Sequence, residues 1–330
     1  METHTFKHDS YYRPYHYDGH RDIKRLPLRL PNEHPYLYYG IELEVEFDSS
    51  ELNIYDEDND YYDEDEENND NWKLDELLDE FSDITDGLFC YEKDGSLDNG
   101  VEFISRPCSY AFWTSPETVE KLQKGLDFLR DHGAYWDQPS TNGMHIHISR
   151  KFFDKGETKL SDRQDAYRSF DWLFQKFQPE LEKIGGREYT HYCQSKAKKI
   201  ENSIRSNVSS YTYNGNVELK MQAKIKKGGE LAYNDHCSAV NLGNTTIEAR
   251  IFKSTTDYKQ VLANIELVRN FAHAVREENI EKTLNELLHT KDNLYLDEQV
   301  RKINMECRRK KDELDLEKKN NNEIEINIEQ

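Results

Sequence analysis

The stretch Gly40-Ile41-Glu42-Leu43-Glu44-Val45-Glu46-Phe47 alternates strictly between apolar and polar residues. Side chains of a β-strand point alternately to its two faces, so this period of two predicts a strand with one apolar and one acidic face. Three carboxylates in one row repel each other unless positive charge neutralises them. The stretch therefore predicts a sheet whose apolar face packs on helices and whose polar face holds metal ions.

Three further segments show the same alternation, and their polar positions add complementary groups. They run from Val101 to Ser105, from Met144 to Ser149 and from Thr246 to Phe252. If the four strands share one sheet, their polar side chains meet on its open face. Those positions hold Glu102, His145, His147, Ser149, Glu248 and Arg250.

Composition narrows the classes of function. The net charge of the 330 residues is −21, and the segment from Glu51 to Asp86 carries most of it, with its acids opposed by Lys73 alone. The remainder is close to neutral, so neither nucleic acid nor an anionic membrane is an expected partner. The five cysteines are scattered without a C-x-x-C pair, which predicts a reducing compartment, and no segment resembles a signal peptide. These features predict a cytoplasmic protein.

Proline content, charge and periodicity divide the chain into three parts. Residues 1–34 are expected to form an extended polar and aromatic arm, residues 35–280 a catalytic domain, and residues 281–330 a helical, charged tail that frays by Asn320. Within the domain, residues 49–70 are too acidic to pack and predict a solvated insertion, while Val217 to Ile225 predicts a further strand. Strands in hairpins with helices between them predict an α+β fold, with an antiparallel curved sheet and helices on one face.

The polar groups expected on the open face suit divalent cations. Carboxylate and imidazole ligands in this proportion are hard and oxygen-rich, so Mg²⁺ or Mn²⁺ fits better than zinc. An arginine beside them could stabilise charge on a phosphoryl group during transfer. Taken alone, Glu-x-Glu-x-Glu is typical of a solvated strand and Glu-x-Arg of a cross-strand ion pair, so the joint occurrence carries the prediction. The predicted ligands are Glu42, Glu44, Glu102, His145 and Glu248, with Arg250 beside them.

These motifs, in this order, resemble those of a known family. The segment from Gly143 to Ser149, preceded by Pro139 and Asn142, resembles the nucleotide-site signature of glutamine synthetases. The whole set is similar to the phage and bacterial amidoligases, which are stand-alone relatives of glutamine synthetase and glutamate–cysteine ligase. The matching blocks are Gly40 to Glu44, Asp94-Gly95-Ser96-Leu97 with Val101-Glu102, Gly143 to His147, and Asn241 with Thr246 to Arg250.

The resemblance implies a glutamine synthetase-like, ATP-dependent carboxylate–amine ligase that acts through an acyl phosphate, in the host cytoplasm if phage-encoded. By the same resemblance, Glu42, His145 and Glu248 would hold one Mg²⁺, Glu44 and Glu102 the other, and Arg250 would steady the γ-phosphoryl group. Its substrates would be the carboxylate and amine of amino acids, peptides or proteins. Other nucleotide contacts would come from His147 and Ser149, with Arg187, Lys220 and Lys224 as candidates for the phosphates, and the base for the amine from Glu46 or Asp94.

Other readings of the same residues stay open at this point. A metal-dependent phosphotransferase could use the same sheet architecture. A metal hydrolase built on His145 and His147 would leave Glu42, Glu44 and Arg250 unexplained. A non-catalytic virion or peptide-binding module could retain the fold, although clustered acids without a metal would then serve no purpose.

Overall fold

The computed structural model describes a subset of the chain, to which every structural statement below refers. The predicted acidic insertion at 49–70, the predicted strand from 217 to 225 and the first 26 residues of the expected arm lie outside the described residues. The described residues are 27–31, 33–47, 71–92, 94, 97, 100–136, 142–155, 159–187, 238–243 and 245–328.

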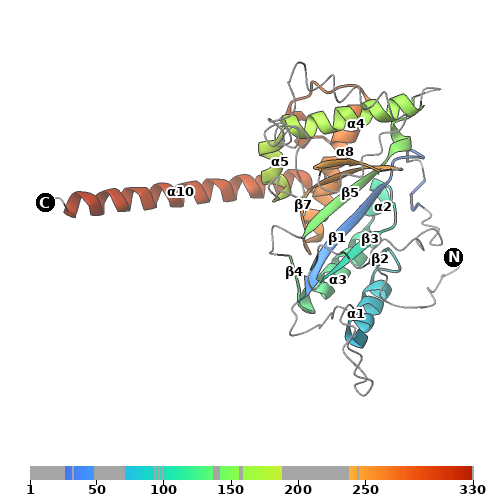
Figure 1. Cartoon of the computed structure of the whole chain (residues 1–330), viewed down its shortest axis with the longest axis horizontal. Helices are drawn as coiled ribbons and strands as arrows, with labels where there is room; N and C mark the ends of the chain where they lie inside the picture. The colour runs from blue at the N-terminus through green and yellow to red at the C-terminus, as the bar shows by residue number, and fades with distance from the viewer. Residues whose placement is uncertain are drawn as a thin grey trace, which may run out of the picture.

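A seven-stranded sheet forms the centre of the described structure (Figure 1). Its strand order is β2-β3-β1-β5-β7-β6, and β4 pairs with β1 on the same edge as β5, beyond the Gly143 end of β5; every pairing is antiparallel. The strands span β1 Tyr39–Phe47, β2 Phe89–Glu92, β3 Gly100–Ser105, β4 Ala134–Tyr135, β5 Gly143–Ser149, β6 Val240–Leu242 and β7 Thr246–Lys253.

Helices cover the apolar face of this sheet. Side chains of α1, α3, α4, α8 and α9 form one buried core with the apolar positions of the strands, such as Ile41, Leu43 and Ile146. Figure 1 shows α1 near the β2–β3 end of the sheet and α4 and α5 near β7. The prediction of an α+β fold with an antiparallel sheet is therefore confirmed. The helices span α1 Asn71–Ile84, α2 Tyr110–Trp113, α3 Pro116–Asp131, the 3₁₀ helix η2 Arg150–Phe153, α4 Lys159–Lys176, α5 Gln178–Gly185, α8 Tyr258–Arg276, α9 Leu284–Leu288 and α10 Leu296–Ile328.

Local signals explain where several elements begin. Helix α3 starts at Pro116, because Ser115 accepts a hydrogen bond from the Thr118 N–H and proline suits the first helical position. The segment before β1 is also packed: Leu28 forms a bridge with Cys108, and Glu33 accepts a hydrogen bond from the Ala111 N–H at the start of α2. The last residues of the expected arm are thus part of the folded body.

One deviation from strict alternation occurs in β7, opposite the middle of β5. Ile146 pairs with Ala249 while Met144 pairs with Phe252, so two residues of β7 lie opposite the single residue His145. This is a β-bulge, which bends a strand and redirects its side chains. The alternation predicted for this segment still holds through Ile251, which is fully buried, while Arg250 lies beside Glu248 on the polar side; the bulge then lets Phe252 pair with the apolar Met144.

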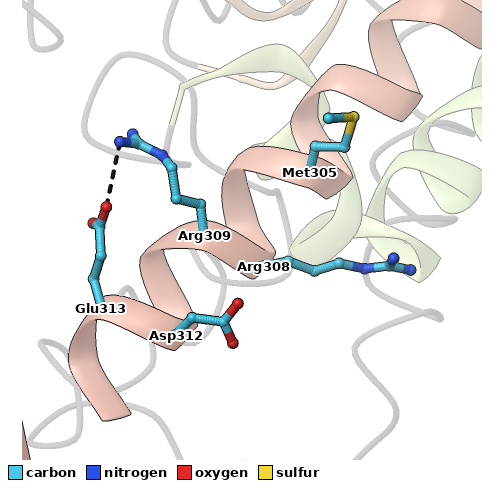
Figure 2. Close-up of a pocket in the computed structure, with 5 residues that line it drawn as sticks. All are labelled: Met305, Arg308, Arg309, Asp312 and Glu313. Atoms are coloured by element: carbon cyan, nitrogen blue, oxygen red, sulfur yellow. Dashed lines mark hydrogen bonds and ion pairs between the residues drawn. The ribbon is translucent and has the colours of Figure 1, made fainter. Parts of the chain in front are cut away.

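The C-terminal helix α10 extends away from the rest of the molecule (Figure 1). It continues to Ile328, so the prediction that the helix frays by Asn320 is wrong. Ion pairs one turn apart, including Lys310 with Glu306, support a solvated helix of this kind. A shallow hollow on its surface lacks the acid–imidazole grouping of a metal site, and Figure 2 shows its lining residues Met305, Arg308, Arg309, Asp312 and Glu313. None of the helices in the described ranges is long and apolar enough to cross a membrane.

Candidate metal centre

The strand register brings the predicted acids and the histidine onto one face of the sheet. In β1, Glu42 lies directly opposite His145 of β5, and Glu44 lies opposite Glu102 of β3. Partners in an antiparallel pair project to the same side. The pairing of β1 with β3 and with β5 is therefore enough to bring these four side chains to one face. Glu248 joins them from β7, through the pairing of β5 with β7.

His145 lies between two groups of carboxylates. Its Nδ1 is 3.2 Å from Glu42 Oε2 and 3.5 Å from Glu248 Oε1, while its Nε2 is 3.3 Å from Glu44 Oε1. Two sets of ligand atoms result, each with all of its atoms within 4.8 Å of one another: Glu42, His145 and Glu248, and Glu44, Glu102 and His145. These are the five residues predicted as ligands. Their convergence is a feature of the structure, and metal binding by them stays a prediction.

Glu248 is fixed by neighbours on both sides. Asn241, which is opposite it in β6, donates from Nδ2 to Glu248 Oε2 at 3.0 Å, and Arg250 Nη1 lies 2.5 Å from Glu248 Oε1. The β-bulge places Arg250 opposite His145, which directs its guanidinium along the polar face. Arg250 is largely buried, and its Nε is without a hydrogen-bond partner among the described residues. Its position beside Glu248 matches the sequence prediction.

His147, predicted to contact a nucleotide, lies beside Glu42 in this structure, and its nucleotide contact stays a prediction. Its Nε2 is 2.9 Å from Glu42 Oε1, and its Nδ1 is 3.1 Å from the Thr246 hydroxyl. Burial lowers the pKa of His147, but the Glu42 carboxylate more than offsets that effect and the pKa rises to about 9. A protonated His147 therefore neutralises and orients Glu42.

Electrostatics show that the acids lack sufficient positive charge. Burial, followed by the nearby Glu42 and Glu44 carboxylates, raises the pKa of Glu102 well above its usual range. Burial also raises the pKa of Glu44. For Glu248, the cost of burial is outweighed by Arg250, so its pKa is lowered. The cluster is thus neutralised near Glu248 and has an excess of negative charge near Glu102. A bound cation would compensate that excess.

Arg187 enters the same cluster from the end of α5. It is 2% exposed, and its charge acts on Glu44. The Glu44 carboxylate itself accepts a hydrogen bond from the Gly143 N–H. A Cβ on Gly143 would overlap the Arg187 guanidinium, which would then have to move. The sequence marked Arg187 only as a candidate for nucleotide phosphates.

The remaining predicted residues have different positions. Glu46 is buried on β1 two residues beyond Glu44, opposite Gly100 and Tyr135 and outside both ligand sets. Asp94 acts electrostatically on Glu44 and Glu102 from the β2–β3 connection. The side chain of Ser149 is at the far end of β5, where η2 begins. Lys220 and Lys224 lie outside the described residues.

Comparison with protein families supplies the family of this chain. A model described as "Putative amidoligase enzyme" matches residues 36–272, which is most of the chain and includes every strand of the sheet. The chain belongs to this amidoligase family. Membership supports an enzyme of the ligase class, and it confirms the resemblance derived from the motifs. Among the curated proteins compared, none matches the chain.

Two supporting residues escaped the site prediction. Asn241 was noted as part of a motif but given no role, although it holds Glu248. Ser254, just after β7, donates to the backbone carbonyl of Glu44 at 2.5 Å. Neither contact has a local sequence signal, because each joins residues brought together only by strand pairing or by the chain's return to β1.

Proposed function

We propose that the protein is an ATP-dependent carboxylate–amine ligase that forms an amide through an acyl phosphate at a site for two Mg²⁺ ions. The observation that carries this proposal is the pair of overlapping acid sets that share His145, with a guanidinium beside each. Amidoligase membership supports the ligase class.

The donor set fits Mg²⁺ on structural grounds. Four carboxylates and one imidazole form an oxygen-rich set, and the raised pKa of Glu102 marks a deficit of positive charge. His145 Nδ1 lies 3.2 Å from Glu42 and 3.5 Å from Glu248, so it can share a cation with both carboxylates. A neutral imidazole offers one lone pair, so Nδ1 would bind that ion and the N–H on Nε2 would point toward the Glu44 carboxylate.

Glu42, His145 and Glu248 would hold one ion, and Glu44 and Glu102 the other. Bound Mg²⁺ would neutralise the phosphate oxygens of ATP. Within the protein, Asn241 and Arg250 fix Glu248, and protonated His147 fixes Glu42. These contacts pre-arrange the acids, so little reorganisation is needed when the substrates bind.

The reaction divides into two displacements. An oxygen of the substrate carboxylate attacks the γ-phosphorus, and the bond from that phosphorus to ADP breaks. The amine nitrogen then attacks the acyl carbon, inorganic phosphate leaves, and a base takes the proton released from nitrogen. Arg250 would stabilise charge during the first displacement. Asp94 is the better candidate for the base, since its charge reaches Glu44 and Glu102 whereas Glu46 is paired beyond the cluster.

A metal-dependent phosphotransferase is the second candidate, because the acid cluster and Arg250 suit phosphoryl transfer without ligation. Isotope transfer separates the two functions. The purified protein is incubated with ATP, Mg²⁺ and pools of amino acids and peptides, and release of ADP and phosphate identifies the substrates. With ¹⁸O in the substrate carboxylate, the ligase transfers label to phosphate. Label that stays wholly in the product, or formation of AMP and pyrophosphate, excludes the acyl phosphate.

A further inference from the structure

Arg187 has donor groups that the described protein leaves unused. The residue is 2% exposed, and within the described ranges its Nε and Nη1 have no hydrogen-bond acceptor. Buried guanidinium groups are normally paired, because an unpaired buried charge is costly. Glu44 supplies nearby negative charge, but one of its oxygens accepts from the Gly143 N–H and the other faces His145. The missing acceptor is therefore expected from a ligand.

The backbone is arranged to place this guanidinium. Helix α5 ends at Gly185, whose Cα lies so close to the Ile251 carbonyl that a side chain would collide. Gly186 then adopts a left-handed conformation, with φ of 70°, and bridges to Phe252 of β7. This turn delivers Arg187 to the start of β5, where Gly143 leaves the room that its guanidinium occupies. Gly185 and Gly186 are thus required by the backbone path that leads to Arg187, and Gly143 leaves space for its guanidinium.

The two arginines of the site serve different ends of the acid cluster. Arg250 is paired with Glu248 in the set containing Glu42, and its charge also reaches Glu44; Arg187 acts on Glu44, in the set containing Glu102, more strongly than Arg250 does. A ligase brings two anions together, the γ-phosphate of ATP and the substrate carboxylate, and each needs its own neutralising group. If Arg250 serves the phosphoryl group, Arg187 remains for the carboxylate. Its planar fork matches a carboxylate through two parallel N–H donors.

We propose that Arg187 binds the carboxylate of the substrate that becomes activated, which makes it a specificity-determining residue. The inference rests on the proposed ligase function and adds to it the position of the carboxylate. It differs from the sequence-based expectation that Arg187 contacts the nucleotide phosphates, and that expectation becomes the alternative outcome of the test.

The first measurement requires no nucleotide. The full-length, Mg²⁺-loaded protein is labelled with ¹⁵N, and the Nε–Hε signal of Arg187, assigned by its loss in Arg187→Lys, is followed during titration with sodium acetate. A saturable shift of this signal supports the proposal. The same shift is expected in the Arg250→Lys protein, which serves as the matched control. A signal that does not respond to acetate overturns the proposal, whether or not the protein hydrolyses ATP.

The second measurement separates carboxylate from phosphate. Calorimetry gives the affinity of Mg²⁺ with a non-hydrolysable ATP analogue, AMP-PNP, for the wild type and Arg187→Lys. We expect affinities within about 2-fold and, once a substrate is found, a KM for the carboxylate raised about 10-fold or more. Weakening of analogue binding by about 10-fold or more makes Arg187 a phosphate ligand and overturns the proposal. Wild-type protein that fails to bind AMP-PNP contradicts the ligase function instead, and the acetate titration then decides the role of Arg187 alone.

If Arg187→Lys does not fold, Gly143→Ala replaces it, because the added methyl group overlaps Nη1 and displaces the guanidinium. A folded Gly143→Ala protein whose response to acetate matches the wild type in affinity contradicts the proposal. Loss of the acetate response, with AMP-PNP affinity within about 2-fold of the wild type, supports it.

Discussion

His145 illustrates how single side chains determine the properties of this site. Its two ring nitrogens face different acid groups, Nδ1 toward Glu42 and Glu248 and Nε2 toward Glu44. The neighbouring His147 has a different task, since its raised pKa keeps it charged beside Glu42. Two histidines of one motif thus divide between a predicted ligand and a positioning residue, and only their surroundings distinguish them.

Arg250 gives the most direct test of chemistry at the residue scale. Arg250→Lys keeps the charge but loses the planar fork that faces Glu248. We expect ADP formation to slow by roughly 10²-fold or more, with nucleotide affinity changed by no more than about 3-fold, because the arginine acts mainly in the transition state. Single-turnover kinetics and calorimetry measure the two effects. Equal losses of rate and affinity would identify Arg250 as a ground-state anchor.

The carboxyl group of Asp171, which is not part of the metal centre, provides a second test at the residue scale. It is buried on α4, it accepts a hydrogen bond from Gln175 Nε2 at 3.1 Å, and burial raises its pKa to about 7. A raised folded pKa means that stability is full below the unfolded pKa near 4 and is lost as pH rises to about 7. Each pH unit in that range lowers the free energy of unfolding by about 1.4 kcal/mol at most.

Asp171→Asn should therefore raise the melting temperature more at pH 8 than at pH 5. Thermal unfolding across this range measures the difference between variant and wild type. Asp165→Asn, on the exposed side of the same helix, provides the control and should show little dependence on pH. An equal effect of Asp171→Asn at both values would show that Asp171 is already ionised in the folded protein.

At the scale of elements, the features predicted from sequence are those encoded by local periodicity. The alternation in β1, β3 and β5 identified the strands, their polar faces and the five predicted ligands. The bulge in β7 and the path of Arg187 had no such signal, because both depend on contacts between segments far apart in the chain. Asn241 lies only seven residues from Glu248, but alternation alone does not show that its amide faces that carboxylate across the β6–β7 pairing.

Glu266 joins two helices and permits a test at this scale. The carboxylate is fully buried on α8 and accepts hydrogen bonds from three backbone N–H groups, those of Leu294, Tyr295 and Leu296, where α10 begins. Tyr110 donates to it as well. The negative charge also favours its place at the helix N-terminus.

Glu266→Ala should lower the free energy of unfolding by roughly 2–4 kcal/mol, because several donors lose their charged acceptor. Denaturant unfolding measures this loss, with the exposed Glu277→Ala near the end of the same helix as control. The metal-dependent chemistry should persist in the folded fraction. A loss below about 0.5 kcal/mol would mean that water replaces the carboxylate without cost.

At the scale of the whole molecule, the acid cluster lowers the stability of the metal-free protein while it provides the groups predicted to bind metal. Glu102 lies beside Glu42 and Glu44, and its raised pKa records the cost of placing another carboxylate in a buried site. Buried carboxylates with strongly raised pKa values are typical of functional sites, whose unfavourable electrostatics the rest of the fold must offset. The large core shared by the strands and the helices supplies that support.

Mg²⁺ should therefore stabilise the whole fold. At a Mg²⁺ concentration 100 times Kd, binding to the native state contributes about 2.7 kcal/mol, which corresponds to a rise in melting temperature of about 5 °C. Glu102→Gln removes one of the crowded charges and one predicted ligand. This variant should melt higher than the wild type without metal, yet gain much less from added Mg²⁺. Calorimetric scans with EDTA and with Mg²⁺ measure both effects, and the exposed Glu76→Gln on α1 should behave as the wild type. A Glu102→Gln protein that is destabilised without metal and keeps the full response to Mg²⁺ would remove Glu102 from the metal centre, because neither the repulsion nor the coordination assigned to it would then exist.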